Sequence, residues 1–600
     1  MNYDNKNFIL AIVLSMLIIF GWQYFYAAPL QKKLATETAQ TQSGAPATTA
    51  GQQQAAPAAG GTVPGAAAAA APANRDEVIA ATPRVKIETP YVGGSINLQG
   101  AQIDDLHLLR YRETVDPKSP TITFLSPNGT PGALFAEQGL VPATGTLAKL
   151  PDSKTLWTAP AGAVLTEDTP VTLTWDNGEG LLFSRTIAIG DEYLFTITQT
   201  VENKSQTPIA LIPYSRIQRQ DTPVVSGYWV FFEGMLGWLE GGLQEIHYKD
   251  VAEQTEPQKI DSTGGWLGFT DKYWAAAVIP DQKKPVTASF LHTKANGRDL
   301  YQTDYLAKDA LVVQPGATAS HADQFFAGAK VVSTIDAIGS KHGIEGFSYM
   351  IDWGWFYFLT KPFFYLLDWL KGLVGNFGIA ILLATVLVKL AVLPLANKSY
   401  ASMSKMKKLQ PEMEKLKQDY PDDRVKQQQA MMELYKREKV SPLSGCLPVV
   451  VQIPIFFALY KVILTSIELR HAPFFGWIHD LSAPDPTSLF NLFGLIPWTP
   501  PAMLMIGVWP IIMGITMWLQ MRLNPAPPDP VQASLFNWMP VMFTFMLGTF
   551  PVGLVIYWAW SNTLSILQQS YIMKRHGVDI DFFGNVKNSL PFLRKKKATS

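Results

Sequence analysis

Runs of about twenty mostly apolar residues recur in this chain and constrain its fold more than any other feature. As a helix rising about 1.5 Å per residue, such a run crosses a hydrocarbon core of about 30 Å. Only 16% of the residues are charged, which is low beside the roughly 25% usual in soluble proteins. The sequence therefore predicts an α-helical membrane protein with about six spans, at residues 8–28, 377–396, 447–466, 503–522, 535–550 and 552–573.

The first run is predicted to be a membrane anchor that stays on the protein. Cleavage after Ala28 would place Tyr26 where a signal peptidase needs a small residue, with Pro29 directly beyond the cut. Residues 1–28 are therefore expected to form a transmembrane anchor. Residues 29–79 are expected to be a flexible linker, because their Ala, Gln, Pro and Gly tract lacks the large apolar side chains that offset ordering entropy.

Residues 80–340 change to short segments in which apolar and polar residues alternate. VTLTW (171–175) and LLFSRTIAI (181–189) flank the turn DNGEG, which predicts an antiparallel hairpin. Repeated over this length, the pattern predicts an all-β sandwich. Its histidines have no metal-ligand spacing, and the chain has a single cysteine, Cys446. We therefore predict no metal site, no cofactor and no catalytic residues, so the chain is not expected to be an enzyme.

The helical half is predicted to contain three kinds of segment. Residues 350–375 mix aromatic side chains with Lys361, Asp368 and Lys371, which favours an amphipathic helix lying in the membrane interface. Residues 376–575 are expected to hold the membrane core. Within it, residues 398–440 are expected to form a charged helical hairpin in the cytoplasm.

Lysine and arginine residues predict the orientation of the spans. Eleven of them lie between residues 397 and 440, and more follow in the basic tail at 576–600. The positive-inside rule places both segments in the cytoplasm. Counting back from residue 397 through the two spans before it puts the β domain outside and the N-terminus in the cytoplasm. In a double-membraned bacterium, outside means the periplasm. The formal net charge of zero predicts no DNA partner.

Lys389 is a lone positive charge inside an apolar run, where it costs about 2.5 to 3.5 kcal/mol on insertion scales. It lies about seven residues from the cytoplasmic end of its run, so snorkelling of its long stem is one explanation. A water-filled site is the other. Polar residues on the same and neighbouring spans support this second explanation, although they could simply bond helices together: Thr385, Gln452, Ser561, Asn562 and Ser565.

Three segments resemble the YidC membrane protein insertase family of bacterial inner membranes: 441–462, SPLSGCLPVVVQIPIFFALYKV; 466–486, SIELRHAPFFGWIHDLSAPDP; and 550–562, FPVGLVIYWAWSN. The resemblance implies a five-helix core with a hydrophilic groove that receives nascent membrane proteins and helps them insert and fold, alone or with the Sec translocon. It places Lys389 where the family usually has arginine. It also places Tyr557 and Trp558 among the aromatic residues that line the substrate slide, although packing explains them almost as well.

Two other classes compete with an insertase. A secondary transporter could use Lys389 to bind an anionic solute, but the chain shows no repeated halves with matched broken helices. An intramembrane serine protease using Ser444 lacks a histidine in any predicted span. The basic tail also suggests a contact with ribosomal RNA, although the positive-inside rule explains the same charges.

Overall fold

The computed structural model describes residues 63–64, 73–225, 231–254, 256–421, 423–438, 440, 447–498, 500–501, 504–524 and 530–578. The predicted anchor at 1–28, most of the linker and most of the basic tail lie outside these residues.

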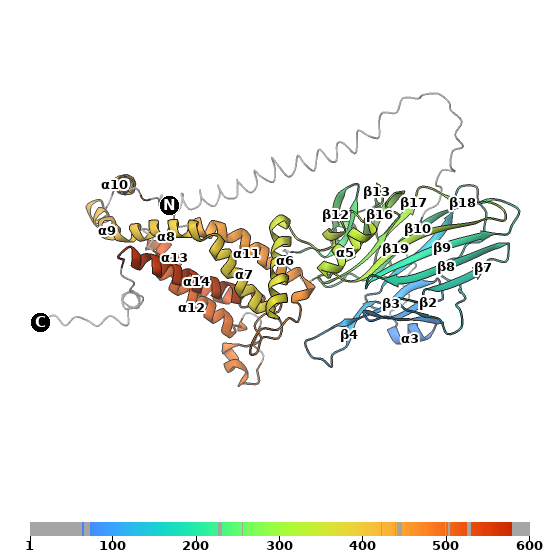
Figure 1. Cartoon of the computed structure of the whole chain (residues 1–600), viewed down its shortest axis with the longest axis horizontal. Coiled ribbons are helices and arrows are strands. Elements are labelled where there is room, and N and C mark those ends of the chain that lie inside the picture. Colours follow the sequence, from blue (N-terminus) through green and yellow to red (C-terminus); the bar gives the residue numbers. More distant parts are fainter. Residues whose placement is uncertain are drawn as a thin grey trace, which may run out of the picture. The chain divides into compact units, whose positions relative to one another are not determined.

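The first half of the described chain is a sandwich of two β-sheets (Figure 1). The larger sheet has the order β13-β16-β17-β10-β5-β3-β2-β1-β6, with β18 beside β10 and β4 beside β3. Its strands are β1 (Arg84–Glu88), β2 (Val92–Asn97), β3 (Gln102–Arg112), β4 (Thr121–Leu125), β5 (Leu134–Pro142), β6 (Val164–Leu165), β10 (Ile209–Gln220), β13 (Gln258–Thr263), β16 (Pro285–Ala295), β17 (Arg298–Ala307) and β18 (Leu311–Val313). The prediction of an all-β sandwich is confirmed.

The second sheet has the order β12-β11-β14-β15-β19-β9-β8-β7. Its strands are β7 (Val171–Asp176), β8 (Leu181–Gly190), β9 (Leu194–Asn203), β11 (Gly234–Leu239), β12 (Gly242–Ile246), β14 (Trp266–Thr270), β15 (Trp274–Ile279) and β19 (Thr318–Ala329). Apolar side chains from the inner faces of both sheets form one continuous core. Among the largest buried side chains are Trp266, Phe195 and Phe325.

The β7–β8 hairpin shows how local sequence sets this fold. Every second residue of β8 is buried, as its alternating sequence predicts. The Asn177 side chain accepts hydrogen bonds from the backbone N–H groups of Glu179 (2.8 Å) and Leu181 (3.0 Å). Gly178 and Gly180 both have positive φ, at 74° and 87°, which glycine adopts without strain. The turn chemistry and the alternation therefore specify the same register.

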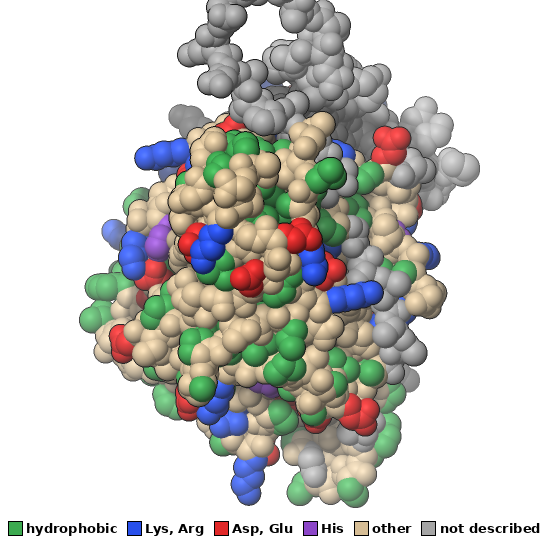
Figure 2. All heavy atoms as spheres, turned by 90° about the vertical axis from the view of Figure 1, so that its right-hand side faces the viewer, with side chains coloured by type: hydrophobic (Ala, Val, Ile, Leu, Met, Phe, Trp, Pro, Cys, Tyr) green, Lys and Arg blue, Asp and Glu red, His purple; other side chains and the backbone are tan. Residues whose placement is uncertain are grey.

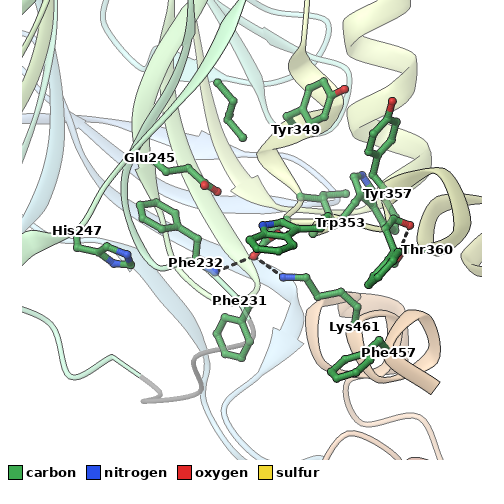
Figure 3. Close-up of a pocket in the computed structure, with 16 residues that line it drawn as sticks. Phe231, Phe232, Glu245, His247, Tyr349, Trp353, Tyr357, Thr360, Phe457 and Lys461 are labelled. Atoms are coloured by element: carbon green, nitrogen blue, oxygen red, sulfur yellow. Dashed lines mark hydrogen bonds and ion pairs between the residues drawn. The ribbon is translucent and has the colours of Figure 1, made fainter. Parts of the chain in front are cut away.

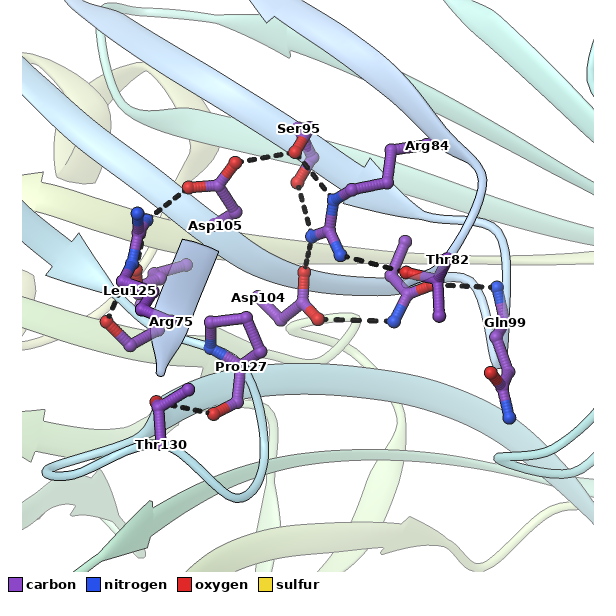
Figure 4. Close-up of polar contacts among 12 residues, drawn as sticks. Arg75, Thr82, Arg84, Ser95, Gln99, Asp104, Asp105, Leu125, Pro127 and Thr130 are labelled. Carbon is purple, nitrogen blue, oxygen red and sulfur yellow. Dashed lines mark hydrogen bonds and ion pairs between the residues drawn. The ribbon is translucent and has the colours of Figure 1, made fainter. Parts of the chain in front are cut away.

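Two ion pairs, one buried and one partly buried, connect the start of the domain to β3 of the larger sheet (Figure 4). Helix α3 (Arg75–Ala80) lies within the segment expected to be linker, and Arg75 pairs with Asp105 of β3. Arg84 of β1 pairs with the neighbouring Asp104. Burial raises the pKa of Asp104 to about 6 in spite of this partner.

Charges are mixed on the exposed face of this domain that Figure 2 shows. Lysine and arginine side chains alternate there with aspartate and glutamate, and no extended area of one sign is visible. This face therefore lacks the basic surface that nucleic-acid binding requires.

The second half of the described chain is helical. After α4 (Tyr248–Ala252), which lies within the sandwich, the helices are α5 (Val332–His342), η2 (Phe347–Met350), α6 (Tyr357–Val374), α7 (Phe377–Ala391), α8 (Leu393–Lys408), α9 (Gln410–Asp419), α10 (Arg424–Arg437), α11 (Leu447–Thr465), η4 (Ile467–Leu469), η5 (Leu489–Gly494), α12 (Val508–Leu523), α13 (Pro530–Leu547) and α14 (Val552–Arg575). Helix α14 packs against α7, α8, α11 and α12.

The predicted continuous span at 377–396 is wrong in one respect, because its helix breaks between Ala391 and Leu393. Helices α7 and α8 meet there at 69°. Pro394 lies in the first turn of α8, lacks a backbone N–H and disfavours helical backbone at the residue before it. Among the described residues this bent pair together is long and apolar enough to cross a membrane, and no single helix is. The count of six spans stays a prediction.

The predicted hairpin at 398–440 comprises the end of α8, then α9 and α10. It has an additional break at Leu409, where α8 ends. Tyr435 of α10 lies over Met413 of α9, with 3.8 Å between the hydroxyl and the sulfur. Arg437 pairs with Glu412 at 2.8 Å. The two arms of the hairpin therefore contact each other through a hydrogen bond from a hydroxyl to a sulfur and through an ion pair.

Candidate functional site

Lys389 lies in the last turn of α7, and its amino group contacts two other helices. Its Nζ donates to Oε1 of Gln452 on α11 (3.2 Å) and to Oγ of Ser565 on α14 (2.8 Å). The side chain is half-buried. Within the described part of the chain, no carboxylate forms an ion pair with Lys389. The charge is therefore held only by neutral hydrogen-bond acceptors.

Gln452 connects the lysine to a polar stripe on α14. Its amide nitrogen donates to the hydroxyl of Tyr557 (2.5 Å) and to Oγ of Ser561 (3.0 Å). Tyr557, Ser561 and Ser565 are four residues apart in sequence, so they share one face of the helix. Ser565 in turn donates to the Ser561 carbonyl (2.9 Å). We call these five residues, Lys389, Gln452, Tyr557, Ser561 and Ser565, the Lys389 network.

Two predicted site residues lie outside this network. The Thr385 hydroxyl is buried and donates to the Ile381 carbonyl of its own helix (2.6 Å). Asn562 points toward α12 instead, where its amide donates to Oγ1 of Thr516 (3.4 Å). Both side chains already have partners within the helices, so neither contacts Lys389.

The two aromatic residues expected to line a slide have different environments. Tyr557 is 2% exposed, and its hydroxyl belongs to the Lys389 network. Trp558 stacks on Phe456 of α11 with 4.5 Å between ring centroids and 12° between the ring planes. It also borders an apolar cluster of Met513, Leu547, Val555 and Ala559. Tyr557 thus contributes a hydroxyl to the Lys389 network, whereas Trp558 packs α14 against α11.

The hydrogen bonds of Lys389 offset only part of the cost of its charge. A charge at the centre of a span costs about 2.5 to 3.5 kcal/mol on insertion scales, and a hydrogen bond between membrane helices returns about 0.6 kcal/mol. The two hydrogen bonds to Lys389 therefore offset about 1 kcal/mol, less than half of that cost. Since no described carboxylate pairs with Lys389, its positive charge can attract a carboxylate from outside the chain.

A second polar contact, which the sequence did not reveal, lies at the other end of α11 (Figure 3). Lys461 pairs with Asp352 at 2.5 Å. Asp352 also accepts hydrogen bonds from the backbone N–H groups of Phe232 (2.8 Å) and Gly354 (2.9 Å). These groups border a cavity of about 620 Å³, lined mainly by apolar and aromatic side chains of the segment 349–357 and by Phe231 and Phe232. In the sequence, Lys461 looks like any lysine near the end of a predicted span. Only its contact with Asp352 marks it as part of a polar site.

Comparisons with known proteins agree with this architecture. The family model described as YidC periplasmic domain matches residues 84–366, and the model described as 60Kd inner membrane protein matches residues 369–578. The chain is thus an inner-membrane protein with a periplasmic β-sandwich domain. It is 52% identical to the membrane protein insertase YidC of Bradyrhizobium diazoefficiens over 99% of both chains. It is 51% identical to that of Beijerinckia indica over 100% of both.

The chain belongs to the YidC membrane protein insertase family. Among solved structures, it is similar to an active YidC insertase crystal structure with the first transmembrane domain resolved. That similarity covers 81% of this chain and 91% of the other, with 20% identity and a TM-score of 0.34.

Proposed function

We propose that the Lys389 network is the place where this insertase receives the polar part of a nascent membrane protein. The observation that carries the proposal is a positive charge shared by α7, α11 and α14 with only neutral partners. The translocated segment of a client enters beside Lys389, and its acidic residues are attracted to the amino group. The apolar segment of the client leaves between the helices into lipid.

The residues around Lys389 suit this task because they bind the charge without neutralising it. The Gln452 carbonyl oxygen and the Ser565 hydroxyl take the place of water molecules around the ammonium group. A client carboxylate that replaces either acceptor gains a charge–charge interaction, which is stronger than the neutral hydrogen bond it displaces. Once the client's apolar helix is in lipid, its burial supplies the driving force, so the step requires neither covalent chemistry nor a bound cofactor.

The proposed topology places the described helices around this site. Helices α7, α11, α12, α13 and α14 form the five-helix core in the inner membrane, with α6 in its periplasmic interface. Helices α9 and α10 and both chain termini lie in the cytoplasm. The lysines and arginines of 397–440 and of the tail support this orientation through the positive-inside rule.

The proposed partners are nascent membrane proteins, the lipid bilayer, the Sec translocon and the ribosome. Membership of the family supports the first two most strongly. The Sec translocon follows from the resemblance of the core segments to the family. The ribosome contact is supported only by the basic tail, which begins near Lys574 and Arg575.

Reconstitution into liposomes that contain only this protein tests the proposal. A small single-span client with an acidic translocated tail is expected to insert, with its tail protected from added protease. Uptake of a labelled anionic solute without client insertion would instead support a secondary transporter.

A further inference from the structure

The larger sheet carries a row of buried polar side chains on the face turned away from the second sheet, which we call the outer face. On β5, Leu134, Ala136 and Leu140 belong to the core between the sheets, so the alternating residues Glu137 and Gly139 point outward. The outer face is built from side chains that are each at most 8% exposed: Gln102, Glu137, Tyr214, Arg216, Gln218, Gln302 and Asp304. These polar side chains are buried although they lie on the outside of the sandwich.

Arg216 is the centre of this row. It is paired in register with Glu137 of β5 on one side and with Asp304 of β17 on the other. Its guanidinium donates to Glu137 (2.9 Å), which also accepts from the Tyr214 hydroxyl (2.8 Å). The Tyr214 ring lies over Gly139, where a Cβ would come within 2.5 Å of it. The side chains that hold Arg216 are therefore fixed by the strands themselves.

The guanidinium of Arg216 also reaches a segment far away in sequence. Its Nη1 donates to the backbone carbonyl of Pro64, 152 positions earlier in the chain. Val63 packs beside it on a small apolar cluster next to Arg216, formed by Val141, Ala143, Ile212, Tyr214 and Ala307. Two residues of the expected linker thus contact both the charged and the apolar part of the outer face.

The chemistry of these contacts is that of peptide recognition. A guanidinium N–H bonds a backbone carbonyl, which any extended chain offers. The apolar cluster accepts one small branched side chain, and proline has no backbone N–H that would need a partner. Residues 57–72 carry no charged side chain, which suits a face where Arg216 already pairs with Glu137.

We propose that the outer face is a recognition site for an extended, uncharged polypeptide segment, and that residues Val63–Pro64 of the same chain are its resident occupant. The linker is then docked on the sandwich at this point. A tethered occupant has an effective concentration in the millimolar range, so an external segment binds only weakly until the linker is displaced. The site is independent of the Lys389 network.

Peptide binding to the full-length protein in nanodiscs tests this proposal. The probe is a fluorescein-labelled peptide with the sequence of residues 58–70, and the protein variant is Val63→Asp, which puts a carboxylate against the apolar cluster. Fluorescence anisotropy is expected to show at least tenfold tighter binding to the variant than to the wild type. A labelled peptide that carries the same Val63→Asp change is the matched control and is expected not to bind. Equal binding of the two peptides, or binding to neither protein, would overturn the proposal.

A second variant tests the contact with the carbonyl. Arg216→Lys in the Val63→Asp background keeps the charge beside Glu137 and loses the planar fork that reaches Pro64. The peptide is expected to bind about tenfold more weakly, and unchanged binding would contradict the assignment. If this variant does not fold, a photo-crosslinking amino acid at position 63 replaces it, and cross-links are expected on β5 and β10. Client insertion by the Val63→Asp variant is expected to stay at the wild-type rate, so failure here leaves the proposed insertase mechanism untouched.

Discussion

Gln452→Glu is predicted to switch off the attraction between Lys389 and acidic clients while keeping the lysine in place. Gln452 Oε1 lies 3.2 Å from the amino group, and glutamate has nearly the same shape as glutamine. Two unit charges at this distance attract by about 5 kcal/mol at an effective dielectric constant of 20, and by about 1 kcal/mol in water. Since each 1.4 kcal/mol is a factor of ten, insertion of an acidic-tailed client should slow roughly tenfold or more.

The rest of the network tolerates this change. The hydroxyls of Tyr557 and Ser561 accept from the Gln452 amide, and each can rotate its own proton to donate to a carboxylate instead. A loss of activity in Gln452→Glu would therefore reflect the neutralised charge. Thermal unfolding of the purified variant should confirm that its stability is retained.

The assay is client insertion into liposomes, measured by protease protection of the translocated tail. Asn562→Asp is the matched control, because it adds a carboxylate to α14 at a position where the side chain faces Thr516 of α12 instead of Lys389. It should insert acidic tails almost as well as the wild type. Both variants should insert a client with a neutral tail. Wild-type insertion of acidic tails by Gln452→Glu would refute the electrostatic argument.

Three further predictions concern stability, each measured by unfolding of the full chain in detergent. Burial raises the pKa of Asp304 from 3.8 to about 6, so the folded protein holds this proton more tightly than the unfolded chain. This group should lower the stability by up to about 3 kcal/mol as the pH rises from about 4 through 6. Asp304→Asn should remove that contribution and leave the one from Asp104, whose pKa is raised to the same value. In Gly514→Ala, the new Cβ would lie 2.1 Å from Oγ1 of Thr544, which should cost about 1 to 3 kcal/mol and be relieved by adding Thr544→Ala. Lys461→Met leaves the Asp352 carboxylate without its cation and should cost about 2 to 3 kcal/mol, whereas Lys461→Arg should cost less.

The sandwich was predictable from local sequence, but its strand order was not. Alternation and the Asn177 turn specify β7 and β8 because both signals act over a few residues. Strand β10 pairs with β5 and with β17, and the paired residues are about 70 to 90 positions apart in the sequence, so this pairing leaves no local signal. The outer face and its contact with Val63 depend on that pairing. A low-complexity linker also gives no indication of where it binds.

The Lys389 network was predictable in part. Helical periodicity placed Ser561 and Ser565 on one face, and the unpaired charge pointed to polar partners on other spans. Tyr557 was expected among the aromatic residues of a substrate slide, and its bond to Gln452 was missed because the sequence does not show which helix its hydroxyl will meet. Thr385 lies on the same helix as Lys389, but a threonine in a helix can donate its hydroxyl hydrogen bond to the backbone carbonyl four residues earlier.

The bend after Ala391 was missed for a different reason. The predicted span was read through Pro394 because the residues on both sides are apolar. Hydropathy reports how well a segment tolerates lipid, whereas the missing N–H of proline determines where the helix stops. The two signals conflict here, and the backbone constraint prevails.

The central claim is that the positive charge of Lys389, rather than its shape, serves insertion. The most direct measurement compares Lys389→Arg with Lys389→Leu in protein-only liposomes, using one client with an acidic tail and one with a neutral tail. The account predicts that Lys389→Arg inserts both clients, and that Lys389→Leu loses the acidic-tailed client while keeping most insertion of the neutral one. Insertion of the acidic-tailed client by Lys389→Leu at the wild-type rate would contradict it.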